Sequence, residues 1–101
     1  MKSEEIIIQT ETVKVRVIEL HPGEVAPLHH HTEIVDTMVG ISGEILVSSK
    51  NPDHEILLTP GLRCAVETGR RHQVSNALKD QPSKYLLIQG VGKYDFIVGE
   101  D

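Results

Sequence analysis

Short apolar runs separated by turn-forming residues recur along the whole chain. Isoleucines fill positions 6–8, and between residues 13 and 17 valines alternate with Lys14 and Arg16, a period-2 pattern that is typical of a half-buried strand. Further apolar runs occupy residues 34–39, 44–49, 54–59, 62–66, 71–77, 85–88 and 96–98. The pattern therefore predicts a succession of short strands.

Glycine and proline divide these runs. Turn-forming clusters stand at residues 21–23, 40–43, 51–53, 60–61, 67–69, 79–82 and 90–92. Their spacing is close to the roughly 8–12 residues that are typical of all-β sandwiches and barrels, and the windows between them are too short for stable helices. We therefore expect an all-β chain without a helix.

Length and composition limit the fold further. A chain of 101 residues buries roughly two-thirds of the surface that its unfolded form exposes, which is enough for one core. Residues 1–101 are therefore expected to form a single domain. Tyr85, Tyr94 and Phe96 are the only aromatic residues apart from histidine, so the core is expected to consist of isoleucine, valine and leucine.

The net charge of −5 argues against a nucleic-acid partner, because phosphate binding requires a basic surface. We expect the basic pair Arg70 and Arg71 to lie in a solvated turn, with contact to an anionic ligand as the alternative.

No run approaches the ~18 apolar residues of a membrane span, and no signal-peptide pattern follows the acidic start. The lone Cys64 cannot form an intramolecular disulfide, and we expect it in the core. These features predict a soluble, cytoplasmic protein.

Three consecutive histidines are the strongest chemical signal. In an extended segment alternate side chains share a face, so His29 and His31 can bind one object while His30 points away. His72 follows a later glycine turn, and a closed or sandwiched sheet brings such distant strands together. With Asp36 these side chains would make a set of three imidazoles and one carboxylate, which suits a first-row transition metal and leaves coordination positions open.

Each of these histidines also has a simpler interpretation. Residues 29–31 could be a polar surface stretch, and His72 could be an ordinary surface or hydrogen-bonded histidine. His21 and His54 stand beside turns without a partner pattern and are expected on the surface.

The joint spacing resembles the cupin superfamily. The family's first motif is glycine, five residues, His-x-His, three or four residues, glutamate, six residues and glycine. Gly23, His29, His31, Asp36 and Gly43 match it, with aspartate in place of glutamate.

The second motif is glycine, five residues, Pro-x-Gly, two residues, histidine, three residues and asparagine. Gly61, Gly69, His72 and Asn76 match it, with Glu67 where proline is usual. The two motifs together span residues 23–76.

The resemblance implies a single-domain cupin barrel, also called a double-stranded β-helix or jelly roll. It also implies that His29, His31 and His72 are metal ligands, that the motif glycines are turn residues and that Asn76 is structural. Asp36 is one methylene shorter than glutamate, so it could bind the ion directly, through water or not at all. Glu33 is its competitor if the strand continues straight.

A cupin barrel of this size encloses a small apolar cavity. Met38 and Val74 lie two residues beyond Asp36 and His72 and point the same way, so they could line it, and Tyr85 and Gln89 share a face of a late strand and could supply polar contacts. Ordinary packing in the core or on the surface is the alternative for each of these residues. The resemblance also implies a homodimer. The isoleucines at 6–8 would form an exposed apolar edge unless a partner covered them.

Two functions remain open on the sequence alone. The first is a metal-dependent enzyme of oxygenase or isomerase type that binds a small polar or oxyanionic substrate at a divalent iron, manganese, nickel or zinc ion. The alternative is a non-catalytic module that binds a small molecule or a metal, because no second carboxylate or lysine marks a general base. A weaker alternative is a metal-free remnant.

Overall fold

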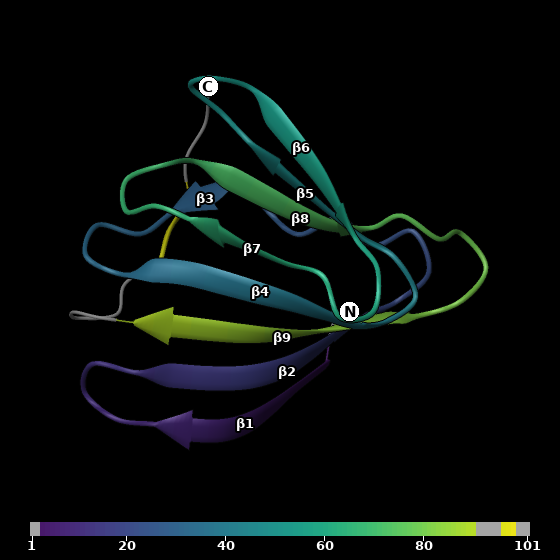
Figure 1. Ribbon diagram of the computed structural model, residues 1–101, viewed down its shortest axis with the longest axis horizontal. Coiled ribbons are helices and arrows are strands. Elements are labelled where there is room, and N and C mark those ends of the chain that lie inside the picture. The colour runs from purple at the N-terminus through teal and green to yellow at the C-terminus, as the bar shows by residue number, and fades with distance from the viewer. Residues whose placement is uncertain (1–2, 91–95, 99–101) are drawn as a thin grey trace.

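A computed structural model describes residues 3–90 and 96–98, and every regular element in this part of the chain is a β-strand. The strands form two five-stranded antiparallel sheets (Figure 1). The first has the order β1 (Ser3–Gln9), β2 (Lys14–Leu20), β9 (Ser83–Gly90), β4 (Val35–Ser42) and β7 (Arg63–Val66). The second has the order β10 (Ile97–Val98), β3 (His29–His30), β8 (His72–Asn76), β5 (Ile45–Ser49) and β6 (His54–Leu58).

The expected all-β architecture is confirmed. Val91, Gly92 and Tyr94, which belong to an expected turn and to the aromatic set, lie outside the described residues. The residues that are described contain no helix able to span a membrane.

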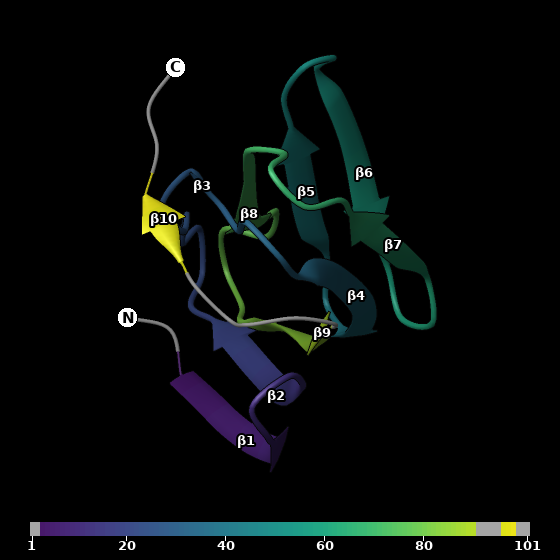
Figure 2. The same ribbon diagram turned by 90° about the vertical axis from the view of Figure 1, so that its left-hand side faces the viewer.

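The two sheets face each other across an aliphatic core. In Figure 2, β5, β6 and β8 lie on one side and β1, β2 and β9 on the other. The core cluster comprises Ile18, Leu20, Met38, Ile45, Val47, Leu58, Val66, Val74, Tyr85 and Leu87. Cys64 is half-buried and packs against this cluster, as expected for a small core residue. Burial raises the pKa of its thiol, which disfavours the reactive thiolate.

Strand β2 differs from the simplest interpretation of its sequence. If the valines of residues 13–17 faced the core, Arg16 would lie outside. The structure has the reverse: Arg16, Ile18 and Leu20 are buried, and Val15 and Val17 are only half-buried. The large apolar residues that follow the valines therefore set the phase of the strand, and they turn a charged side chain inward.

Gly40 was expected in a turn, but β4 continues through it to Ser42. A Cβ atom at this position would collide with the backbone carbonyl of Thr59. Glycine is therefore required here by the close approach of a neighbouring segment. The turn comes at Gly43, where φ is +72°.

Asn76 joins the end of β8 to three other segments. Its Nδ2 atom donates to the backbone carbonyls of Leu20, His21 and Gln81, and its Oδ1 atom accepts from the Leu78 amide and the Ser83 hydroxyl. The side chain is buried. The structural role expected from the cupin resemblance is therefore confirmed.

Candidate metal centre

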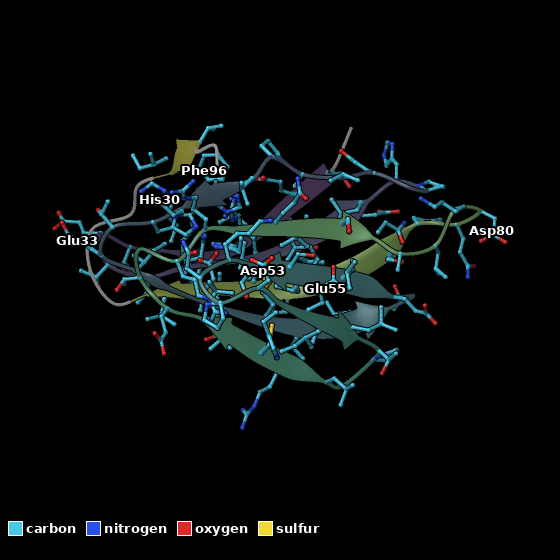
Figure 3. The ribbon with its side chains drawn as sticks, turned by 90° about the horizontal axis from the view of Figure 1, so that it is seen from above. His30, Glu33, Asp53, Glu55, Asp80 and Phe96 are labelled. Carbon is cyan, nitrogen blue, oxygen red and sulfur yellow. The ribbon has the colours of Figure 1, made fainter. Side chains whose placement is uncertain are left out.

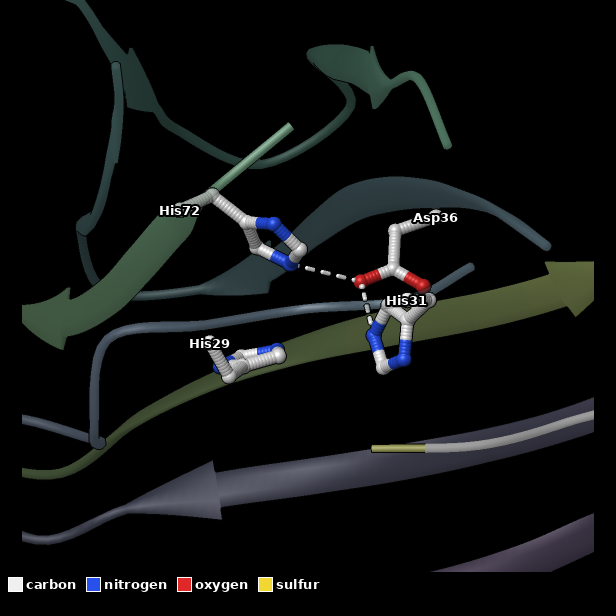
Figure 4. A group of neighbouring side chains, drawn as sticks. All are labelled: His29, His31, Asp36 and His72. Atoms are coloured by element: carbon white, nitrogen blue, oxygen red, sulfur yellow. Dashed lines mark hydrogen bonds and ion pairs between the residues drawn. The ribbon is translucent and has the colours of Figure 1, made fainter. Parts of the chain in front are cut away.

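Four side chains from both sheets meet at one end of the core, and we call them the candidate metal centre: His29, His31, Asp36 and His72 (Figure 4). His29 and His72 are directly opposed residues of the neighbouring strands β3 and β8. His31 follows β3, and Asp36 lies in β4 of the other sheet. One potential ligand atom of each residue lies within 4.8 Å of the others.

The spacing of these atoms fits a bound ion. The Oδ2 atom of Asp36 lies 3.1 Å from Nε2 of His31 and 2.8 Å from Nε2 of His72. Metal–nitrogen and metal–oxygen bonds of roughly 2.0–2.2 Å place adjacent ligands of an octahedral ion about 3 Å apart. The four residues could therefore hold a metal ion.

Backbone carbonyls orient two of the rings. The Nδ1 atom of His29 donates to the carbonyl of Pro27 at 2.8 Å, and Nδ1 of His72 donates to the carbonyl of Arg70 at 3.0 Å. Such a contact fixes the neutral tautomer whose proton is on Nδ1, so that Nε2 keeps its lone pair for a metal. The donor atoms are thus preset for coordination.

A loop positions His31. The amide of Gly69 donates to the backbone carbonyl of His31 at 2.6 Å, and Gly69 has a φ of +76°, a conformation that favours glycine. Glu67, where cupins usually have proline, is exposed in the same loop. The Arg70 side chain donates to the carbonyls of Lys50 and Pro52, so it braces a neighbouring turn.

Burial sets the charge state of the centre. His31, Asp36 and His72 are each at most 2% exposed, and His29 is 7% exposed. Burial is the largest influence on His29 and lowers its pKa to about 4, so this ring is neutral at pH 7. Burial on its own raises the pKa of Asp36, but polar contacts with the side chains of His31, His72 and Gln89 outweigh it and hold the pKa well below its usual range. The centre therefore combines neutral imidazole with an ionised carboxylate.

Hydrogen bonds connect the centre to the outer strand β1. Nε2 of Gln89 donates to Oδ1 of Asp36 at 2.9 Å, and Oε1 of Gln89 accepts from Nη2 of Arg16 at 2.5 Å. Nη1 of Arg16 in turn pairs with Oε2 of Glu4 at 3.2 Å. Gln89 therefore fixes the orientation of the Asp36 carboxylate.

A cavity of about 50 Å³ adjoins the centre. Its walls are Arg16, Ile18, Ala26, Pro27, His29, Asp36, Met38, Val74, Tyr85, Leu87, Gln89 and Phe96. The four residues that the sequence offered as possible lining residues, Met38, Val74, Tyr85 and Gln89, all lie at the cavity.

The remaining candidate residues lie apart from the centre. Glu33 is exposed at the edge of the molecule (Figure 3), so Asp36, and not Glu33, joins the three imidazoles. His30 is half-buried and does not belong to the cluster, whereas His21 and His54 are exposed as expected.

Six lining residues have no predicted role in the sequence analysis, and the two that matter most for the chemistry of the site are Arg16 and Phe96. The alternation of valines with Lys14 and Arg16 points Arg16 outward, whereas the two-residue spacing of Arg16, Ile18 and Leu20 indicates that the three share the inner face. Phe96 stacks on the ring of His29, with centroids 4.2 Å apart and planes inclined by 24°. No signal in the sequence connected Phe96 with His29.

Two facing antiparallel sheets that bring His-x-His, a carboxylate and a later histidine together beside a cavity define a double-stranded β-helix with a candidate metal site. The chain belongs to the cupin family, whose domain model, described as "Cupin domain", matches residues 16–89. No curated protein matches the chain.

Solved structures of low sequence identity share this fold. An uncharacterised Klebsiella pneumoniae protein with a double-stranded β-helix domain has a TM-score of 0.83 at 24% identity, with 99% of this chain and 85% of that one covered. A Desulfitobacterium hafniense cupin superfamily protein has a TM-score of 0.78 at 16% identity, with 91% and 79% covered. Oxalate oxidase in complex with the substrate analogue glycolate has a TM-score of 0.81 at 15% identity, with 96% and 54% covered. The chain thus spans about half of the oxalate oxidase.

Proposed function

We propose that this protein is a metal-dependent enzyme of oxygenase or isomerase type that acts on a small oxyanionic substrate. The observation that carries the proposal is the convergence of His29, His31, His72 and Asp36 beside an internal cavity. Three imidazoles and one carboxylate suit divalent iron, manganese, nickel or zinc. A bound ion would serve as Lewis acid and as a template for substrate oxygens.

The surrounding residues support this role. Pro27 and Arg70 present the rings through their carbonyls, and Gln89 orients the carboxylate. Apolar side chains such as Met38 and Leu87 line the cavity and limit the access of water. Exclusion of water strengthens every electrostatic interaction inside a site. The oxalate oxidase of similar fold is described with glycolate, so oxalate and glycolate are the first compounds to assay.

The test is elemental analysis of protein purified without chelators or a polyhistidine tag, followed by oxygen-consumption and isomerisation assays on small carboxylates. His31→Ala and His72→Ala are expected to lose metal and activity together. His54→Ala is the matched control, because His54 is exposed and lies outside the centre. Activity that survives the loss of metal would contradict the proposal.

A non-catalytic binding module is the second candidate. Among the described residues that line the cavity, the ionisable side chains besides His29 and Asp36 are Arg16 and Tyr85. Burial raises the pKa of Tyr85, so neither group serves as a general base near pH 7. Redox-inert zinc, no turnover and a melting temperature that follows metal content would favour this candidate.

We further propose a homodimer through the edge strand β1. Every residue of β1 is exposed, and Ile6, Ile7 and Ile8 are 50–55% exposed. A long apolar edge strand is a site for pairing with another chain, and a second copy is the simplest partner. A cytoplasmic location stays a prediction.

A further inference from the structure

We propose that Arg16 anchors the carboxylate of a small monoanionic ligand in the cavity beside the candidate metal centre. The inference rests on the proposed function, because it names the class of ligand and the residue that selects it. Arg16 would bind the carboxylate from the β2 side, and the ion would bind the ligand from the side of the centre.

The position of Arg16 is unusual for a charged residue. It lies in the middle of β2, is 6% exposed and faces the core in phase with Ile18 and Leu20. Removing a guanidinium from water is costly unless anions or hydrogen-bond acceptors surround it. A buried arginine in register with Ile18 and Leu20 therefore requires partners of negative charge or hydrogen-bond acceptors.

The hydrogen-bond partners of Arg16 leave one N–H group of its guanidinium without an acceptor among the described residues. Nη1 pairs with Glu4 and Nη2 donates to Gln89. Nε is buried and has no hydrogen-bond partner within the part of the chain that is described. The N–H groups of a guanidinium form a planar fork that matches the two oxygens of a carboxylate. A ligand carboxylate would supply the acceptor that Nε lacks.

The cavity places Arg16 and the centre around one space. Arg16, His29 and Asp36 all line it, and its volume is about 50 Å³. Since one water molecule needs roughly 10–15 Å³ by this measure, the ligand has only a few non-hydrogen atoms. Apolar side chains, which include Met38 and Leu87, form much of the wall, so few polar partners remain for a larger hydrophilic molecule.

Charge balance selects an anion. A divalent ion on three neutral imidazoles and the Asp36 carboxylate keeps one positive charge. The charge of Arg16 is offset by Glu4, whose side chain is 33% exposed on β1 and does not line the cavity. The interior therefore retains about one unit of positive charge at low dielectric, where an opposite charge is strongly favoured. A monocarboxylate neutralises it.

The experiment uses the full chain loaded with Co(II), whose visible spectrum responds to a new ligand. Acetate is titrated into the wild type, Arg16→Met, Arg16→Lys and Glu4→Gln. Loss of a charge-assisted hydrogen bond predicts that acetate binds Arg16→Met roughly ten- to a hundredfold more weakly than the wild type. Arg16→Lys keeps the charge without the fork, so we expect a smaller loss. Glu4→Gln is the control, and its acetate affinity is expected to be equal to or higher than that of the wild type.

A purely structural role predicts a different result. If Arg16 only held Gln89 and thereby Asp36, its replacement would weaken Co(II) binding and leave the acetate affinity of the Co(II)-loaded protein unchanged. That result overturns the inference, as does equal loss of acetate binding in Glu4→Gln. If Arg16→Met does not fold, an unchanged acetate affinity in Arg16→Lys overturns it. Wild-type protein that holds Co(II) but not acetate overturns this inference alone, whereas failure to hold Co(II) overturns the proposed function as well.

Discussion

The Nε2 atom of His72 lies 2.8 Å from the Oδ2 atom of Asp36. The other nitrogen of the same ring donates to a backbone carbonyl, and a neutral imidazole has only one N–H group. Whenever this ring carries a single proton, its Nε2 lone pair therefore faces a carboxylate oxygen. A nitrogen lone pair and a carboxylate oxygen repel each other at this distance unless a proton or a metal cation lies between or beside them. This pair is the clearest structural reason to expect a cation at the centre.

Asp36→Asn keeps the shape of the side chain and removes its charge. We expect its affinity for divalent metal to fall by roughly a hundredfold or more, beyond the 10–100-fold typical of an outer-shell partner. Asp36→Glu restores the carboxylate that the cupin motif usually carries and is expected to bind metal far better than Asp36→Asn. Competition with a chromophoric chelator measures both affinities. Equal affinities in Asp36→Asn and the wild type would show that the carboxylate is not a ligand.

Removal of metal is expected to lower the melting temperature. An ion present at a hundred times its dissociation constant stabilises the folded state by about 2.7 kcal/mol, which corresponds to roughly 10–20 °C for a domain of this size. Scanning calorimetry before and after dialysis against a chelator measures the change. His72→Gln is expected to abolish the response to added metal, and the His54→Ala control is expected to keep it.

Acid is expected to destabilise the metal-free protein through His29. The folded-state pKa of this ring is about 4, below the unperturbed value of about 6.5, so the unfolded state binds more protons between these two values. The free energy of unfolding therefore decreases as the pH falls from about 6.5 to about 4. Urea unfolding of the chelator-treated protein across this range measures the slope. His29→Gln is expected to flatten it, and an unchanged slope would assign the effect to another group.

Loss of the Asn76 side chain is expected to destabilise the fold. Asn76→Ala removes five hydrogen bonds and leaves the buried Ser83 hydroxyl without the acceptor Oδ1. We expect a decrease of about 2–4 kcal/mol in the free energy of unfolding. Gln81→Ala is the control, because only the backbone carbonyl of Gln81 takes part. If Asn76→Ala unfolds at the same urea concentration as the control, the Asn76 side chain does not stabilise the fold and the prediction is wrong.

The dimer proposal predicts a change of mass in solution. Ile7→Lys places a charge on the exposed face of β1, where it would oppose pairing with a second copy. We expect sedimentation of the wild type as a dimer at micromolar concentration and of Ile7→Lys as a monomer. A monomeric wild type would end this proposal and leave the metal centre unaffected.

The motif residues made the fold and the centre predictable, because their spacing reflects backbone geometry. Gly69 adopts a positive φ and binds the carbonyl of His31, and Asn76 joins four segments. Such residues have few substitutes, so they leave a recognisable pattern. The cupin pattern implies a corner after His31 and therefore favours Asp36 over Glu33, and Asp36 is the carboxylate that lies with the three imidazoles.

The sequence alone does not predict that the side chain of Arg16 points into the core. Valines at 13, 15 and 17 indicate one face of β2, whereas Ile18 and Leu20 indicate the other, and only packing against the opposite sheet decides between them. The stacking of Phe96 on His29 depends on where the chain returns after β9. Local patterns do not encode such long-range contacts.

The candidate ligands come from both layers of the molecule: His29 and His72 belong to one sheet and Asp36 to the other. Any ion that all four side chains hold is therefore a cross-link between the layers. Unlike a disulfide, it would act on the folded state alone, because the unfolded chain offers no preformed site for the ion. Dissociation of the ion would let the two layers separate at this end, so the loaded and empty forms are expected to differ most in protection from amide hydrogen exchange at β3, β4 and β8.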